Sequence, residues 1–387
     1  MTSAQVVTPR TGSARERWGR VLSVLGSLQG YVGLVLVIAF GIISKGHIFF
    51  NSINLTNAVG AFASRGILAV GETLVILTAG IDLSVGSMLG LASMVSALLL
   101  VYEGLPPLLI LPVCMGVGAV MGLLNGVGTT LLRIQSFVMT LAMLSVFRGV
   151  DRQLSDNVSV GTQVVTASGK LTKHSEQFQL FGTPGHNLTS GLYYPVIALV
   201  AVVIVFQWIL SRTRFGRHLY AVGGNEIAAR LSGVNVTRVR IAVFVLAGLL
   251  AGFAGPIDAA YSASADPLAG QSFELDAIAA AVIGGASLAG GRGSIVGTLV
   301  GSLILTLLDN VLGLNSVSDN LQLIIKGLIV VVAVVIQRPD LISSTVAFWR
   351  RMLRRARSRT ASPAPPDPTP SGTGDPDPTS SGTKEES

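Results

Sequence analysis

A polar segment interrupts the apolar sequence between about residues 66 and 101, and it carries groups that could contact a solute. It reads Gly80-Ile81-Asp82-Leu83-Ser84-Val85-Gly86-Ser87. A carboxylate and two hydroxyls are costly in lipid unless they line a polar cavity or cap a helix. Asp82 or Ser84 is therefore either the N-cap of a helix that begins here or part of a broken-helix site beside a solute pathway.

Other polar side chains lie inside long apolar stretches, namely Arg65, Glu72, Asn125, Asp309 and Lys326. Ionisable groups at membrane depth usually pair with one another and face the protein interior. Glu72 follows Arg65 by two helical turns, so we expect these two residues to share a helix face and to form a pair.

The loop from 212 to 238 is basic and has a pattern that fits a docking element. Asn225 can cap a short helix over residues 226–231, with Glu226 near its start and Arg230 near its end, as the helix dipole favours. Ser232 and Gly233 then end that helix. The loop is either a contact site for a soluble partner or an ordinary basic loop at a membrane surface.

A third segment joins acids to a glycine-rich turn. Glu274 and Asp276 open an apolar span, where the dipole tolerates them, and the glycines between 284 and 293 favour a tight turn. The turn lacks the pattern of a phosphate-binding loop, which occurs nowhere in the chain. The four histidines are scattered without metal-ligand spacing. We therefore predict no enzymatic activity, no cofactor and no metal.

The composition of the chain indicates that membrane-spanning helices hold these segments in place. Of 387 residues, 50% are hydrophobic and only 12% are charged. These values exclude an ordinary soluble enzyme, a disordered chain and a nucleic-acid-binding protein, and they predict an all-α polytopic membrane protein. The only cysteine is Cys114, which excludes an intrachain disulfide. Glycines four residues apart predict close helix packing at 118, 122 and 126 and at 293, 297 and 301.

Apolar stretches long enough to cross a bilayer predict about ten spans. They cover residues 21–44, 56–80, 84–102, 106–132, 135–150, 192–211, 239–262, 275–290, 294–313 and 320–337. With both termini in the cytoplasm, the internal segments hold 19 Lys and Arg residues and the external ones five, as the positive-inside rule favours. This divides the chain into an N-terminal tail (1–20), a membrane domain (21–337) and a basic, then disordered, cytoplasmic tail (338–387). An external loop covers about 151–190 and a cytoplasmic loop about 212–238.

Together, these segments resemble the permease subunits of bacterial sugar-importing ATP-binding cassette transporters of the ribose/xylose/arabinose type, and most of all the ribose permeases. The resemblance rests on residues 74–87, 223–234 and 275–297, with support from 137–141 and 147–149. It implies a multi-pass protein of the bacterial plasma membrane that acts as one of two permease subunits, as a homodimer. A separate ATP-binding subunit would power import, and an external sugar-binding protein would deliver a monosaccharide such as ribose.

Two sets of candidate residues follow. The pathway candidates are Asp82, Ser84, Glu72, Asn125, Thr140 and Asp276. The candidates for docking the ATPase are Gly223, Gly224, Asn225, Glu226, Arg230 and Gly233. The alternative function is an ion-coupled secondary transporter, in which Glu72, Asp82 or Asp309 would carry a proton or a sodium ion. An intramembrane enzyme is disfavoured because the sequence offers no acid–base or metal constellation.

Overall fold

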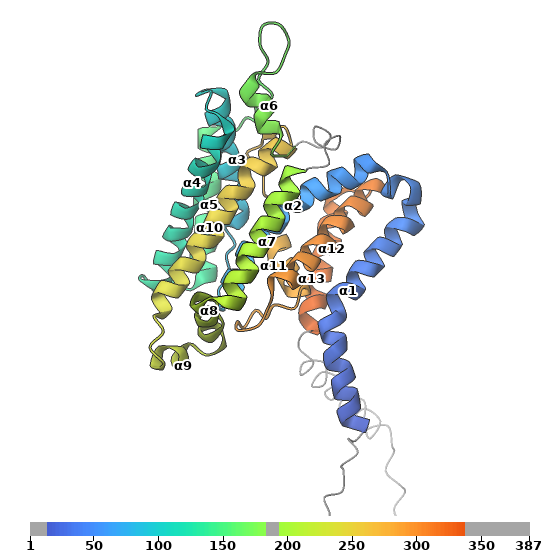
Figure 1. The fold of residues 1–387 in the computed structure, drawn as a ribbon, viewed down its shortest axis with the longest axis vertical. Coiled ribbons are helices and arrows are strands. Elements are labelled where there is room, and N and C mark those ends of the chain that lie inside the picture. The colour runs from blue at the N-terminus through green and yellow to red at the C-terminus, as the bar shows by residue number, and fades with distance from the viewer. Residues whose placement is uncertain (1–13, 183–192, 337–387) are drawn as a thin grey trace, which may run out of the picture. The chain divides into compact units, whose positions relative to one another are not determined.

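The computed structural model describes residues 14–182 and 193–336, and helices dominate this part of the chain (Figure 1). The helices are α1 (Ala14–Phe49), α2 (Ser52–Leu77), α3 (Val85–Val101), α4 (Pro107–Thr130), α5 (Ser136–Leu154), α6 (Lys173–Gln179), α7 (Tyr194–Arg212), α8 (Arg214–Gly224), α9 (Glu226–Leu231), α10 (Val236–Tyr261), α11 (Phe273–Ile283), α12 (Ile295–Leu314) and α13 (Asp319–Ile336). Two short strands, β1 (Val160–Gly161) and β2 (Ser264–Ala265), pair antiparallel. Residues 1–13 of the predicted N-terminal tail, residues 183–190 of the predicted external loop and the predicted tail 338–387 lie outside the described residues.

Each of the ten predicted apolar segments contains a helix. Among the described residues, six helices are long and apolar enough to cross a membrane: the Tyr31–Phe49 part of α1, and α2, α4, α7, α10 and α12. α3 is apolar but shorter, with 17 residues. α11 ends at Ile283 rather than near residue 290, because Gly284 and Gly285 follow it and Gly285 has a φ of +91°. At about 1.5 Å per residue it is too short to cross the roughly 30 Å hydrocarbon core.

α10 lies in the middle of the fold and packs against α2, α3 and α4. The glycine stripe on α4 makes this approach close. A Cβ atom at Gly118 would collide with the carbonyl oxygen of Gly248, and one at Gly122 with that of Phe244. The predicted packing face of α4 is therefore confirmed, and α10 supplies its partner stripe. In lipid, such close backbone contact replaces the hydrophobic drive that packs soluble helices.

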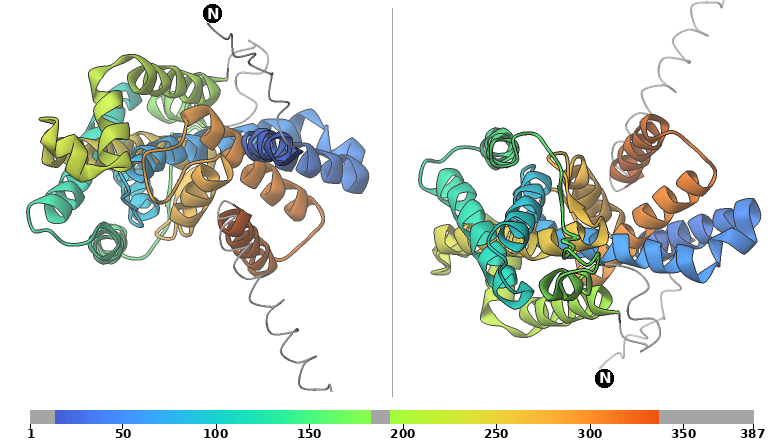
Figure 2. Two further views of the ribbon diagram at one scale, coloured as in Figure 1. Left: turned by 90° about the horizontal axis from the view of Figure 1, so that it is seen from below. Right: turned by 90° about the horizontal axis from the view of Figure 1, so that it is seen from above.

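A second group of helices packs on the other side of α2. α12 contacts α1, α2 and α11, while α13 contacts α11 and α12 (Figure 2). Gly297 and Gly301 lie against the backbone of Gly284 and Ala280 on the α11 side. The prediction that Gly293 shares their helix face was wrong. Gly293 precedes α12 and has a φ of +154°, because the turn needs an extended positive-φ residue there.

The two ends of the bundle carry different elements (Figure 1). α6 and the β1–β2 pair lie at one end, within or beside the loop predicted to be external. α8 and α9 lie at the opposite end, in the loop predicted to be cytoplasmic.

Candidate functional site

The break between α2 and α3 is held by the side chain of Asp82. Asp82 Oδ1 accepts hydrogen bonds from the backbone N–H of Ser84 at 2.8 Å and from Ser84 Oγ at 2.6 Å. Ser84 occupies the N-cap position of α3, but its own side chain makes no capping hydrogen bond. The carboxylate two residues earlier therefore fixes the backbone where α3 begins, as short acidic side chains do in turns.

Three further candidates surround this break. Asn125 Nδ2, from α4, donates to Ser84 Oγ at 2.8 Å and to Asp82 Oδ2 at 3.3 Å. Thr140 Oγ1, from α5, accepts from the N–H of Leu83 at 3.1 Å. Glu72 Oε1, from α2, accepts from the N–H of Asp82 at 3.2 Å.

The structure thus gathers five of the six pathway candidates into one buried cluster, and we call Glu72, Asp82, Ser84, Asn125 and Thr140 the break cluster. All five side chains are 0% exposed. Glu72 Oε2 and Asn125 Oδ1 have no hydrogen-bond partner among the described residues. A cluster buried this deeply connects three helices to the irregular backbone between them, and leaving any member unpaired is costly.

The sixth candidate, Asp276, belongs to a different site. It lies in the first turn of α11 and forms an ion pair with Lys326 of α13 at 3.1 Å. Lys326 also pairs with Asp309 of α12 at 3.2 Å, and Asp309 pairs with Arg65 of α2 at 2.7 Å. This chain of alternating charges links four helices, and its side chains are 12–23% exposed.

The expected pairing of Arg65 with Glu72 was therefore wrong. Two turns of helix separate them by about 10 Å along the axis. Arg65 instead pairs with Asp309 on the neighbouring helix α12. Glu72 instead accepts a hydrogen bond from the backbone of Asp82 at the break. The guanidinium of Arg65 also lies over the ring of Phe273, with its Cζ atom 4.9 Å from the ring centroid, a favourable cation–π distance.

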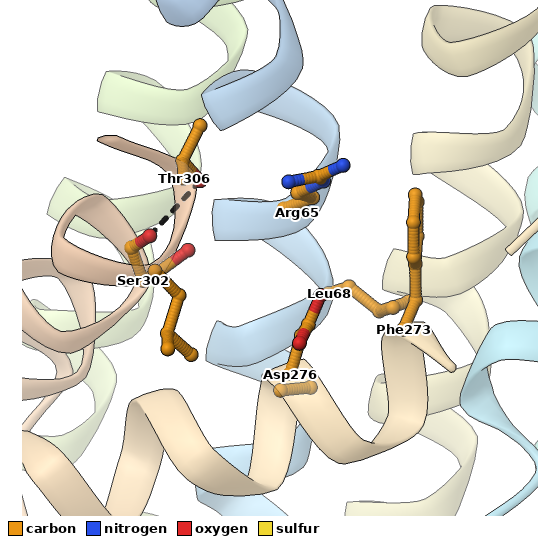
Figure 3. A pocket seen from close by; sticks show the side chains of 8 residues that line it. Arg65, Leu68, Phe273, Asp276, Ser302 and Thr306 are labelled. Carbon is orange, nitrogen blue, oxygen red and sulfur yellow. Dashed lines mark hydrogen bonds between the residues drawn. The ribbon is translucent and has the colours of Figure 1, made fainter. Parts of the chain in front are cut away.

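A small pocket with a largely apolar lining lies beside this ion-pair chain (Figure 3). Arg65, Phe273, Asp276, Ser302 and Thr306 contribute to its lining. Its volume is about 10 Å³, about the room that one water molecule needs. In this conformation the pocket is therefore too small for a sugar.

The predicted capped helix in the basic loop is confirmed as α9. Asn225 Oδ1 accepts from the N–H of Ala228 at 2.9 Å, and Gly233, with a φ of +82°, follows the end of the helix. Glu226 forms ion pairs with Arg230 at 3.0 Å and with Arg240 of α10 at 2.8 Å. The first pair joins the two ends of α9, and the second attaches α9 to α10.

Three sequence segments singled out above meet at this end of the bundle. The backbone of Gly223 lies directly against the carbonyl of Leu77, at the end of α2, so that a Cβ atom there would collide with it. The N–H of Gly291, in the glycine-rich turn, donates to the same carbonyl at 3.0 Å. Tyr220 Oη donates to the carbonyl of Gly293 at 2.9 Å. The docking loop therefore contacts the end of α2 and the 284–294 turn.

One acid was missed among the candidates. Asp258 lies in the predicted span 239–262, and its carboxylate accepts a hydrogen bond from Ser64 Oγ at 3.4 Å. Its presence inside an apolar span was the signal that could have identified it. In the described part of the chain, no group of His, Cys, Asp or Glu side chains is arranged to hold a metal ion.

Apolar helices of membrane length, partly buried ion pairs and irregular backbone fixed by polar side chains define an integral membrane protein. The family described as "Branched-chain amino acid transport system / permease component" matches residues 54–334, and the chain belongs to this family. It is 44% identical over 289 residues to the ribose import permease protein RbsC of Escherichia coli (strain K12), covering 74% of this chain and 86% of that protein.

Two further relatives carry related names. RbsC of Bacillus subtilis (strain 168) is 42% identical over 316 residues, which is 81% of this chain and 94% of that protein. The fructose import permease protein FrcC of Rhizobium meliloti is 36% identical over 302 residues, which is 78% of this chain and 82% of that protein. No solved structure matches the chain significantly.

Proposed function

We propose that this chain is the membrane-spanning permease of a bacterial monosaccharide importer of the ATP-binding cassette type. The observation that carries the proposal is the 44% identity to a ribose import permease over 74% of the chain. The family description mentions branched-chain amino acids, but relatives 33–44% identical are named for ribose, fructose and xylose. We therefore favour a sugar, and ribose first among sugars.

The proposed topology has ten spans with both termini in the cytoplasm. It is supported by the separation of α6 from α8 and α9 at opposite ends of the bundle (Figure 1) and by the excess of Lys and Arg in the segments assigned to the inside. In this arrangement α6 and the β1–β2 pair face the exterior. α11 is too short to cross the membrane domain by itself, so the irregular segment 262–272 before it and the glycine-rich turn after it complete this crossing, as irregular backbone can where it is buried in protein.

The ATPase contact is proposed to centre on α9. Glu226 and Arg230 pair with each other, so the groups of α9 most open to a partner are apolar: Ile227 is 73% exposed and Leu231 is 84% exposed. They are four residues apart and share one helix face. These two apolar side chains can dock into a groove of a partner. Gly223, just before α9, lies against the end of α2 and the 284–294 turn, so a movement of the partner can be transmitted to the membrane domain.

The remaining partners are a sugar-binding protein outside the cell and a second copy of this chain. The missing phosphate-binding pattern supports a separate ATPase subunit. For the break cluster, we favour the anchoring role over the pathway role, because its five side chains are fully buried and bonded to the irregular backbone or to one another. Asp276 stays a pathway candidate beside the small pocket.

Reconstitution into proteoliposomes tests the function. The chain, its ATPase subunit and its binding protein should import labelled D-ribose only when ATP can be hydrolysed, and a proton or sodium ionophore should leave the initial rate unchanged. Excess unlabelled D-ribose should compete, whereas leucine should not. Uptake that needs no ATP and is abolished by an ionophore would instead identify an ion-coupled transporter.

A further inference from the structure

A larger cavity lies between α2, α10 and the segment 262–273 that leads into α11. Its volume is about 380 Å³, within the range of small-molecule sites. Its lining includes polar, charged and aromatic side chains, namely Ser64, Arg65, Asp258, Tyr261, Gln271 and Phe273. Ser264 of β2 and Asp266 lie at the same cavity, so it is at the end of the bundle that carries the β1–β2 pair.

The lining offers hydrogen-bonding capacity that the protein itself leaves unused. Asp258 accepts a single long hydrogen bond among the described residues, from Ser64 Oγ at 3.4 Å, although a carboxylate can accept about four. Arg65 uses Nη1 in its ion pair with Asp309, and a guanidinium has five N–H donors in all. The amide of Gln271 is exposed at the cavity.

Aromatic rings complete this set. Tyr261 and Phe273 both line the cavity, and a ring face packs well against flat, weakly polar C–H groups. A carboxylate, a guanidinium, an amide and ring faces together match a ligand with several hydroxyls on a compact carbon frame. Each hydroxyl donates and accepts, so it can use both kinds of protein partner.

The charges in the cavity favour a neutral ligand. Two carboxylates, those of Asp258 and Asp266, and one guanidinium, that of Arg65, line the cavity. The guanidinium already forms an ion pair with Asp309. Ser159 Oγ and the N–H of Leu268 each donate to Asp266 at 2.7 Å. These hydrogen bonds keep the pKa of Asp266 below its ordinary value, so the rim stays negative at neutral pH. A sugar phosphate or a sugar acid would be repelled.

Arg65 and Phe273, which form a cation–π contact with each other, both line the large cavity. Both residues also line the small pocket next to Asp276 (Figure 3). The large cavity and the small pocket therefore lie on two sides of the same cation–π contact, which measures 4.9 Å.

We infer that this cavity holds one neutral monosaccharide on its way through the domain, and that the Arg65–Phe273 contact separates it from the pocket at Asp276. The inference rests on the proposed function and adds to it the place where the membrane domain itself binds sugar. Asp258 and Gln271 would bind the hydroxyls, and Tyr261 would pack against the carbon frame.

Protection of a single cysteine tests the inference. In a Cys114→Ser background, Ser262→Cys places the reporter at the cavity, and Ser168→Cys places a control in an exposed loop outside it. The complete complex, in nanodiscs and without ATP, is treated with a charged thiol reagent with and without D-ribose at high millimolar concentration. D-Ribose should slow labelling at 262 several-fold and leave labelling at 168 unchanged.

A second variant tests whether the protection of the cysteine at 262 by D-ribose depends on Asp258. Asp258→Asn keeps the shape of the side chain but removes its charge, so half-protection should need about tenfold more D-ribose, as expected for one charge-assisted hydrogen bond. Asp156→Asn, an exposed acid elsewhere, should leave the half-protecting concentration unchanged.

The outcomes separate the inference from the proposed function. If the wild-type complex imports D-ribose with ATP but the sugar protects neither cysteine, or protects 262 equally in the wild-type and Asp258→Asn backgrounds, the cavity is not the binding site and the importer assignment stands. If the wild-type complex imports no monosaccharide, both fail together. Protection at 262 that Asp258→Asn weakens establishes the site.

Discussion

Glu226 Oε2 accepts a hydrogen bond from Arg240 Nη2 at 2.8 Å, and this contact fastens the start of α9 to the first turns of α10. The other carboxylate oxygen accepts from Arg230 Nη2 at 3.0 Å. Glu226 was predicted to contact the ATPase directly. Its engagement with two arginines gives it a different role in our proposal, because it sets the orientation in which α9 presents Ile227 and Leu231.

Reversal of this charge should therefore uncouple the permease without unfolding it. Glu226→Lys places three cations together and puts one of them at the start of a helix, which the dipole disfavours by about 0.3–1 kcal/mol. Each lost surface ion pair contributes only about 0–1 kcal/mol. We expect normal amounts of the variant in the membrane, weaker co-purification of the ATPase and loss of ATP-dependent uptake.

Two companion variants identify the cause. Glu226→Gln keeps a carbonyl acceptor for one of the two arginines and adds no positive charge, so it should retain more uptake than Glu226→Lys. Ile227→Asp, which leaves the ion pairs in place, should weaken ATPase binding as strongly as Glu226→Lys. Full ATPase binding and full transport by both Glu226→Lys and Ile227→Asp would show that α9 is not the coupling contact.

Gly223 should tolerate no side chain, whereas its neighbour should. A Cβ atom at Gly223 would overlap the carbonyl of Leu77 and approach the N–H of Gly291. Forcing such an overlap costs about 1–3 kcal/mol or more, so Gly223→Ala should lower the melting temperature of the purified protein and reduce uptake. Gly224 has no atom within 4 Å of its Cβ position, and Gly224→Ala should melt within a degree or two of the wild type. Equal melting temperatures would refute the contact between α8 and the end of α2.

Local features of the fold could be predicted because short-range physics determines them. The Asn225 cap, the helix over 226–231 and the break at Asp82 follow from side chains that bond to backbone a few residues away. The ten apolar segments follow from the length of helix needed to cross a bilayer. The packing face at Gly118 and Gly122 follows from spacing alone, although its partner on α10 does not.

Contacts between distant segments could not be predicted in the same way. The pairing of Arg65 depends on how α2 is rotated relative to α12, and no local pattern specifies that rotation. Asp276 and Asp82 were both predicted to be pathway candidates, yet they belong to different helix groups. The cavity at Asp258 needs α2, α10 and the 262–273 segment together, so sequence spacing gave no sign of it.

The proposed topology predicts labelling from opposite sides of the membrane. In a Cys114→Ser background, Ser168→Cys in the exposed loop before α6 should react with an impermeant thiol reagent in intact cells. Ser232→Cys, just after α9, should react only after permeabilisation. Both positions are exposed, so accessibility to solvent does not bias the comparison. Labelling of both cysteines in intact cells would overturn the arrangement of both termini inside.

Asp82 offers a test that separates anchoring from a direct role in transport. Three donor atoms of Ser84 and Asn125 bond to its carboxylate inside a fully buried cluster. Asp82→Ala removes the acceptor of both Ser84 donors, at a cost of about 1–3 kcal/mol each, whereas Asn125 keeps its hydrogen bond to Ser84 Oγ. We expect a clear fall in melting temperature and in the amount of protein in the membrane. Asp82→Asn keeps one carbonyl acceptor for Ser84 and caps about as well as Asp, so its fall should be much smaller.

The deciding quantity is uptake per folded molecule. If Asp82 anchors the break, D-ribose uptake by the Asn variant, divided by the amount of folded protein measured by fluorescence-detected size exclusion, should stay close to the wild-type value. Loss of the charge then matters little, because no solute meets it. If Asp82→Asn folds normally and assembles with the ATPase but transports less than about a tenth as much sugar per molecule, about 1.4 kcal/mol or more on the transport barrier, the charge itself acts in the pathway. The anchoring role proposed for the break cluster would then be wrong.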